Sequence, residues 1–187
     1  WRLVKQPRQS SRRDQRRALA GTGGQIALGG NTLTTNSSAN TTLASQITGT
    51  GSLVKLGSGT LTLTGTNTYT GNATTNVGGT LALSGTGSIA TSAQLIDNGT
   101  FDISATTAGA SIITLAGSGS VSLGAQQLNL TNASTTFAGV ISGTGPVLLS
   151  GGTQTLSGTN TYTGTTTINF GTTLALSGTG GIAASSE

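Results

Sequence analysis

The sequence predicts an all-β protein in which short parallel strands stack into a β-helix, or solenoid. Two observations carry this prediction: a strand-like segment recurs every 20 residues, and within it apolar residues alternate with polar ones. The composition agrees, because Gly and Thr together form more than a third of the 187 residues and aromatic residues form only 3%. So few large side chains can fill a narrow core at native packing density, but not a wide one.

The coil length is read from four segments spaced 20 residues apart: Gly59–Leu63 (GTLTL), Gly79–Leu83 (GTLAL), Gly99–Ile103 (GTFDI) and Gly119–Leu123 (GSVSL). Alternation predicts two inward columns, one of Leu61, Leu81, Phe101 and Val121 and one of Leu63, Leu83, Ile103 and Leu123. The outward positions hold Thr62 and Thr64, then Ala82 and Ser84, Asp102 and Ser104, and Ser122 and Gly124. A unit this short leaves no room for a helical crossover. We therefore expect about three strands per coil, centred in the first clear coil on Leu61–Leu63, Tyr69 and Val77.

A longer repeat covers most of the chain. Asn67–Gly71 (NTYTG) recurs 93 positions later as Asn160–Gly164, and Leu81–Gly87 (LALSGTG) recurs at the same offset as Leu174–Gly180. Val121 and Gln154 are 33 residues apart, which is one coil plus thirteen, so we expect a bulged or shifted coil within 124–153. The second copy breaks off near the end of the sequence. We therefore expect residues 21–187 to be a repeat array that is truncated at its C-terminal end and belongs to a longer array.

Residues 1–20 form a basic arm that does not share the repeat. Seven of the eight basic residues lie in it: Arg2, Lys5, Arg8, Arg12, Arg13, Arg16 and Arg17. No apolar stretch follows the arginines, which argues against a secretion signal. We expect the arm to be flexible or helical. It is either a connecting or upstream segment or an arm that contacts a polyanion.

The residue types present disfavour catalysis. The sequence has no His and no Cys, so it lacks the usual neutral-pH base, a thiolate nucleophile and the commonest metal ligands. We expect no catalytic, cofactor-binding or metal-binding residues, no cofactor and no enzymatic activity. Without these groups, stability should barely change between about pH 5.5 and 8, unless the pKa of Asp97 or Asp102 is strongly raised.

Asp97 and Asp102 are the only carboxylates near one another in the repeat array. Asp97 belongs to Asp-Asn-Gly, a turn signature, so we interpret it as a solvated turn residue. Asp102 alternates outward between Phe101 and Ile103. The alternative for this pair is contact with a glycan or Ca²⁺, although too few ligands are evident for a calcium site.

Several recurring small motifs have structural interpretations. The Gly-Thr-Gly segments at 49–51, 85–87 and 143–145 predict turns, because no Gly-Lys-Ser/Thr follows them as in a phosphate loop. Tyr69 and Tyr162 occupy equivalent positions, where we expect them to fill or cover a coil corner, with sugar stacking as the alternative. Asn67, Asn98 and Asn160 lie beside turns, where Asn tolerates left-handed backbone. No apolar stretch is long enough to predict a membrane-spanning helix.

The stretch GSGTLTLTGTNTYTGNATTNVGGTLAL (57–83) resembles the passenger-associated repeat of Gram-negative autotransporters. The second copy, GGTQTLSGTNTYTGTTTINFGTTLAL (151–176), resembles the same repeat, and Lys55–Gly57 is similar to its lead-in. The resemblance implies a right-handed parallel β-helix in a secreted or surface-displayed passenger, often an adhesin.

Four functions are compatible with such a solenoid. The leading hypothesis is a structural and adhesive segment at the bacterial cell surface, displayed on the outer membrane or extracellular. A flank of Thr, Ser and Asn would contact a glycan or protein on a host or neighbouring cell. A second is a filament-forming structural protein that associates head to tail. An ice-binding solenoid requires Thr-x-Thr in successive coils, and a polysaccharide-active β-helix requires catalytic groups, so both are disfavoured.

Overall fold

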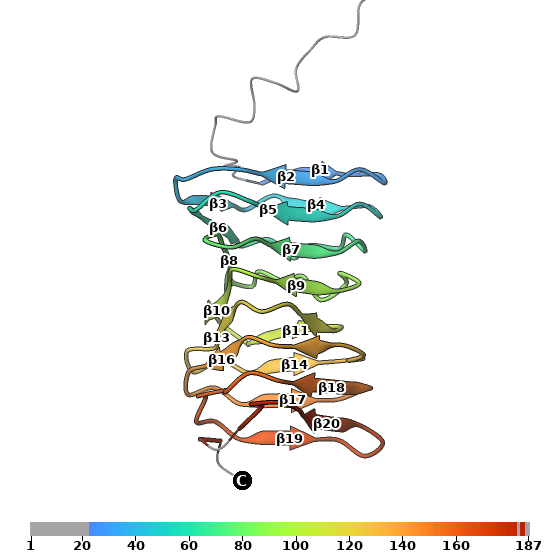
Figure 1. The fold of residues 1–187 in the computed structure, drawn as a ribbon. Helices are drawn as coiled ribbons and strands as arrows, with labels where there is room; N and C mark the ends of the chain where they lie inside the picture. Colours follow the sequence, from blue (N-terminus) through green and yellow to red (C-terminus); the bar gives the residue numbers. More distant parts are fainter. Residues whose placement is uncertain (1–22, 183, 186–187) are drawn as a thin grey trace, which may run out of the picture.

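The computed structural model describes residues 23–182, 184 and 185, and it confirms the predicted fold class. The chain forms a parallel β-solenoid of about eight turns with roughly 20 residues per turn, seen in Figure 1 as a stack of coils. The described residues contain no helix, and thus no helix able to cross a membrane. The basic arm at residues 1–20 lies outside the described part of the chain.

The coils contribute strands to three faces, which the chain visits in the order face 1, face 2, face 3. Face 1 contains β2 (Leu33–Thr35), β5 (Leu53–Lys55), β7 (Ala73–Thr75), β9 (Leu95–Asp97), β12 (Leu115–Ala116), β15 (Thr136–Phe137), β18 (Thr153–Leu156) and β20 (Thr173–Leu176). Face 2 contains β3 (Thr41–Leu43), β6 (Thr60–Leu63), β8 (Thr80–Gly85), β10 (Thr100–Thr106), β13 (Ser120–Ser122) and β16 (Val140–Ser142). Face 3 contains β1 (Gln25–Ala27), β4 (Gln46–Thr48), β11 (Ala110–Ile112), β14 (Leu128–Leu130), β17 (Val147–Leu149) and β19 (Thr166–Ile168).

Faces 1 and 3 are interrupted as sheets but continue in space. On face 1 a bridge joins Gly117 to Phe137, and Gln154 Nε2 donates to the carbonyl of Leu115 at 3.1 Å. On face 3 the segments 66–69 and 88–91 replace strands. They join the coil above through hydrogen bonds such as Thr68 N to Ile47 O, at 2.8 Å. The solenoid therefore keeps three faces along its length.

The ladder on face 2 keeps the 20-residue interval that the sequence predicts. Leu61 pairs with Leu81, Leu81 with Phe101, and Phe101 with Val121. Every member of the two predicted inward columns is buried, with at most 1% of its surface exposed. Each such side chain contributes on the order of 1.5–3 kcal/mol by burial, while the ladder satisfies the backbone polar groups.

Two predicted strand centres are wrong. Only Leu61–Leu63 lies in a strand, β6. Tyr69 is buried in the face 3 segment between the bridge at Thr66 and β7. Val77 is 85% exposed because it lies in the turn that follows β7. The third strand of this coil is instead Ala73–Thr75.

The predicted irregularity within 124–153 is also misplaced. The ladders β13–β16 and β14–β17 pass through that region without a register shift. The shift lies in β10, between Asp102 and Ala105, so Ser84 pairs with Ala105 rather than with Ser104. From Ile141 on face 2, thirteen residues lead past β17 on face 3 to Gln154 on face 1. The second repeat copy is therefore displaced by one face, without a bulge at that point.

Candidate functional site

A groove of about 320 Å³ opens on face 3 where the ladder is interrupted. Residues 85–88 and 90 line one side and residues 107–111 the other, with Gln127 and Asn129 from the next coil. The register shift of β10 immediately precedes the second wall, and such bulges bend the strand that carries them. Strand β11 is the terminal strand of its sheet, so its groove-side edge has no strand partner.

The lining of the groove is polar and uncharged. Among the described residues, neither the Ser111 hydroxyl nor the Gln127 side-chain amide has a hydrogen-bond partner. Asn129 Oδ1 accepts from Ser150 Oγ at 2.7 Å, which leaves its Nδ2 available. Thr107 Oγ1, by contrast, donates to Gly85 O at 3.1 Å and holds the two walls together. The groove therefore offers both donors and acceptors but no charge.

A column of buried polar side chains runs inside face 1. Thr35, Lys55, Thr75 and Asp97 occupy the same register position in four successive coils, and none is more than 8% exposed. Lys55 Nζ donates to the carbonyls of Leu56 and Gly57, and burial lowers the pKa of Lys55. The hydroxyls of Thr35 and Thr75 have no hydrogen-bond partner. Sequence reasoning missed this column.

The interpretation of Asp97 as a solvated turn residue is wrong. Its side chain is fully buried; Oδ1 accepts from Gly99 N at 3.2 Å, and Oδ2 has no hydrogen-bond partner. Burial raises the pKa of Asp97 to about 7, against the opposing effect of backbone hydrogen bonds. Alternation in β9 carried the missed signal, because Leu95 is buried, Ile96 is not, and Asp97 is buried again.

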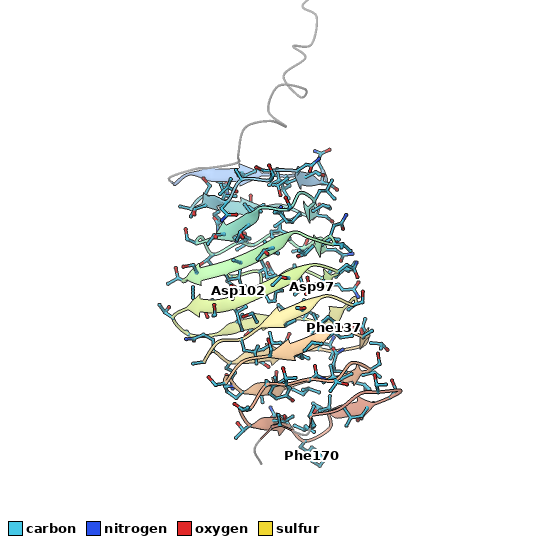
Figure 2. The ribbon with its side chains drawn as sticks, turned by 60° about the vertical axis from the view of Figure 1, so that its left-hand side comes forward. Asp97, Asp102, Phe137 and Phe170 are labelled. Carbon is cyan, nitrogen blue, oxygen red and sulfur yellow. The ribbon has the colours of Figure 1, made fainter. Side chains whose placement is uncertain are left out.

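Asp102 is half-buried on the outside of face 2, as the alternation predicts. Its Oδ1 accepts from Ser104 N at 2.9 Å. The Asp97 side chain points from face 1 into the core, whereas the Asp102 side chain points outward from face 2. The fold therefore does not bring the two carboxylates together (Figure 2). This pair cannot act jointly on a sugar or a calcium ion, which removes the alternative suggested by their proximity in sequence.

Asn67 and Asn160 have the same contacts in the two repeat copies. Asn67 Oδ1 accepts from Ile47 N in the preceding coil at 2.9 Å, and its Nδ2 donates to Ser88 O in the following coil at 2.9 Å. Asn160 Oδ1 accepts from Ile141 N, and its Nδ2 donates to Gly181 O, both at 2.9 Å. Only glycines have positive φ among the described residues, so the predicted left-handed role of Asn is wrong. Each Asn instead ties three coils together.

Tyr69 and Tyr162 fill coil corners. Both rings are fully buried, so neither presents a surface on which a sugar could stack. Burial raises the pKa of both hydroxyl groups, and Tyr162 Oη lies 2.7 Å from Thr166 Oγ1. The Gly-Thr-Gly segments begin with positive-φ glycines, Gly49, Gly85 and Gly143, as expected for turns.

The outer column of face 2 is polar but mixed. In register it holds Thr42, Thr62, Ala82, Asp102, Ser122 and Ser142. Threonine is thus not kept in successive coils, which disfavours an ice-binding surface. The column instead forms a flank of small side chains along the rod.

Each repeat copy presents an exposed apolar residue at the tip of a turn. Val77 is 85% exposed and Phe170 fully exposed. In both turns a glycine with positive φ follows the apolar residue, and Asn76 or Asn169 accepts the closing hydrogen bond, at 3.0 or 3.1 Å. This geometry places the side chain at the outer corner of the turn. Aligning the two repeat copies places Val77 opposite Phe170. The alignment does not indicate that both side chains are exposed.

The family model for the passenger-associated-transport-repeat matches residues 53–83 and 149–176. The first match begins with β5 and ends within β8, and the second runs from the end of β17 to the end of β20. No curated protein and no solved structure gives a significant match. The repeat family implies a secreted or cell-surface location. The two matched repeats and the parallel β-solenoid together support an autotransporter passenger-like repeat protein.

Proposed function

We propose that the solenoid is a structural and adhesive segment of an autotransporter passenger, displayed at the bacterial outer membrane. It holds a long outer flank at a distance from the cell and contacts a glycan or protein on a host or neighbouring cell. We infer a non-enzymatic role, which is supported by Asp97 and Asp102 pointing to different sides of the coil wall.

The observation that carries this proposal is the regular outer flank. Parallel pairing keeps outward residues in register from coil to coil, so Thr62 and Ser122 belong to one continuous outer column of mostly polar side chains. A repeated array of weak contacts gains strength when many engage together. Such a surface suits adhesion to another extended surface better than capture of a single small molecule.

The test measures adhesion of beads coated with the chain to bacterial and epithelial cells, with albumin-coated beads as the reference. Three variants each add two lysines to the outside of one face: Val54 and Thr74 on face 1, Thr62 and Ser122 on face 2, Leu148 and Thr167 on face 3. We expect adhesion above the reference and its loss in at least one variant whose circular dichroism is unchanged. Adhesion no stronger than that of albumin would overturn the adhesive role.

A second candidate function is self-assembly into filaments by contact with a second copy of the chain. Three apolar side chains are exposed in the last coil: Ile168 (47%), Phe170 (108%) and Leu176 (48%). Strands β19 and β20 are terminal in their sheets, as are β1, β2 and β3 at the other end. A coil of another copy could therefore continue the ladder and cover these side chains. Because the two contacting ends differ, such a contact propagates without closing.

A further inference from the structure

We propose that the groove on face 3 binds one neutral sugar unit at the end of a surface glycan. This inference rests on the proposed adhesive function and gives it a specific site. The groove lies between residues 85–90 and 107–111, where the coil wall parts. At this place on face 3 the ladder gives way to an opening of ligand size.

The size of the groove favours a small ligand. Its volume of about 320 Å³ is near the lower end of the roughly 300–1,000 Å³ that small-molecule sites occupy. Ladder hydrogen bonds close both sides, from Thr107 N to Gly85 O at 2.9 Å and from Leu95 N to Thr114 O at 3.0 Å. An extended peptide therefore has no passage between the coils, whereas a single ring can enter from outside.

The hydrogen-bonding groups favour a neutral polyol. A sugar hydroxyl both donates and accepts, and the groove supplies both functions through Ser111, Gln127 and the free Nδ2 of Asn129. The unpaired edge of β11 adds backbone groups on the same side. No charged residue lines the groove, so nothing in it would repay the dehydration of an ionic ligand.

The walls are held in place before any ligand arrives. Thr107 Oγ1 links the two walls through Gly85 O, and Ser88 Oγ accepts from Ala90 N at 3.2 Å. Adding a Cβ to Gly109 would bring it 2.4 Å from Gln127 O, and Gly109 has a φ of 77°, so glycine is required at this wall. A preorganised site loses less conformational freedom when it binds.

The test is an NMR titration of the full chain with methyl β-galactoside, methyl α-mannoside and N-acetylglucosamine. N-acetylneuraminic acid serves as a charged probe and trialanine as a peptide probe. We expect at least one neutral sugar to shift the side-chain NH₂ signals of Gln127 and Asn129. Ser111→Trp fills the groove from the outward position of β11 and should weaken binding about tenfold or more. Thr167→Trp is the matched control, because it lies outward on the same face three strands away.

The outcomes separate this site from the adhesive function. If no neutral sugar shifts these signals, if Ser111→Trp binds as tightly as the parent chain, or if only trialanine or N-acetylneuraminic acid binds, the groove proposal is wrong. Adhesion of beads coated with the parent chain tests the adhesive function independently. Adhesion without sugar binding would support the adhesive function and contradict the sugar site. Sugar binding without adhesion would support the sugar site and contradict the adhesive function.

Discussion

At the scale of single residues, buried amides hold neighbouring coils in register. Asn67 contacts the preceding coil through Oδ1 and the following coil through Nδ2, and Asn160 repeats these contacts. Both side chains are almost completely buried, at 2% and 3% exposed. Loss of such a side chain leaves a backbone N–H of the preceding coil, Ile47 N or Ile141 N, without its partner. The recurrence of Asn-Thr-Tyr in the sequence therefore marks a structural clamp.

Replacing Asn67 by Ala should lower the free energy of unfolding by about 1–3 kcal/mol, because it leaves the buried N–H of Ile47 without its partner. The Ser88 carbonyl keeps the hydrogen bond that it accepts from Asn67 N at 3.0 Å. The control is Asn36→Ala, which removes one hydrogen bond at an exposed position, to Gly57 N at 3.2 Å. That change should cost about 1 kcal/mol or less. Urea unfolding monitored by circular dichroism measures both. Equal losses would show that the three-coil contact adds nothing.

Burial of Asp97 gives the fold a pH dependence that residue types alone do not predict. The folded state holds the Asp97 proton up to about pH 7, whereas the unfolded chain has an ordinary pKa near 3.9. The contribution to stability is therefore complete below about pH 4 and is lost as the pH rises through about 7. We expect the free energy of unfolding to fall by up to about 4 kcal/mol over this range and then to level off.

Asp97→Asn keeps the shape of the side chain and removes the proton, so its unfolding free energy should stay nearly constant from about pH 4 to 8. Urea unfolding at several pH values compares the variant with the parent chain. The same slope in both would assign the titration to another group. The sequence predicts that stability barely changes between about pH 5.5 and 8 unless a carboxyl pKa is strongly raised. Asp97 is such an exception, because burial raises its pKa to about 7.

At the scale of elements, alternation predicted the buried face of strands wherever pairing is regular. Leu61, Leu81 and Phe101 are buried as expected, because period-two patterning in a one-sided strand leaves no other arrangement. It could not locate the register shift after Asp102, where one extra residue in β10 makes Ser84 pair with Ala105 rather than with Ser104. The groove forms next to that shift, so no local sequence pattern predicted the groove. The turn at Val77 was missed because an apolar residue suggested a strand.

Leu81→Asp tests the inward assignment in β8. It places a carboxylate in a fully buried column with no partner, so we expect a loss above about 4 kcal/mol, enough to prevent folding. Thr62→Asp changes the adjacent strand of the same face at a partly exposed outward position, and should change stability by less than about 1 kcal/mol. Circular dichroism and urea unfolding report both. Comparable losses would contradict the inward and outward faces described for β6 and β8.

At the scale of the whole molecule, the second repeat copy is displaced by one face relative to the first. The offset of 93 residues equals four coils of 20 plus thirteen, so equivalent strands such as β6 and β18 lie on different faces. The 20-residue and 93-residue periods are both visible in the sequence. The face on which each repeat copy lies is not visible there, because it depends on how the chain divides each coil among the three faces. Val77 consequently emerges between faces 1 and 2, and Phe170 between faces 3 and 1. Identical motifs thus present their turn tips in different directions around the rod.

This displacement supplies a matched pair for testing self-association. Phe170 lies at the lower end of the rod in Figure 2, beside the exposed Ile168 and Leu176 of the last coil. Val77 occupies the equivalent turn tip after β7, the third of the eight face 1 strands and far from the last coil. If copies associate through the last coil, sedimentation over a concentration series should show growing assemblies of the parent chain, because apolar burial and ladder pairing both favour contact.

Phe170→Ser should reduce this association, while Val77→Ser should leave it unchanged, since only the first removes apolar surface from the contacting end. Electron microscopy should then show rods that lengthen end to end in the parent chain and in Val77→Ser. A chain that remains monomeric at the highest concentration would exclude the filament. Equal weakening by the two substitutions would instead indicate side-by-side contact through the turn tips, because Val77 lies too far from the end coil to take part in stacking.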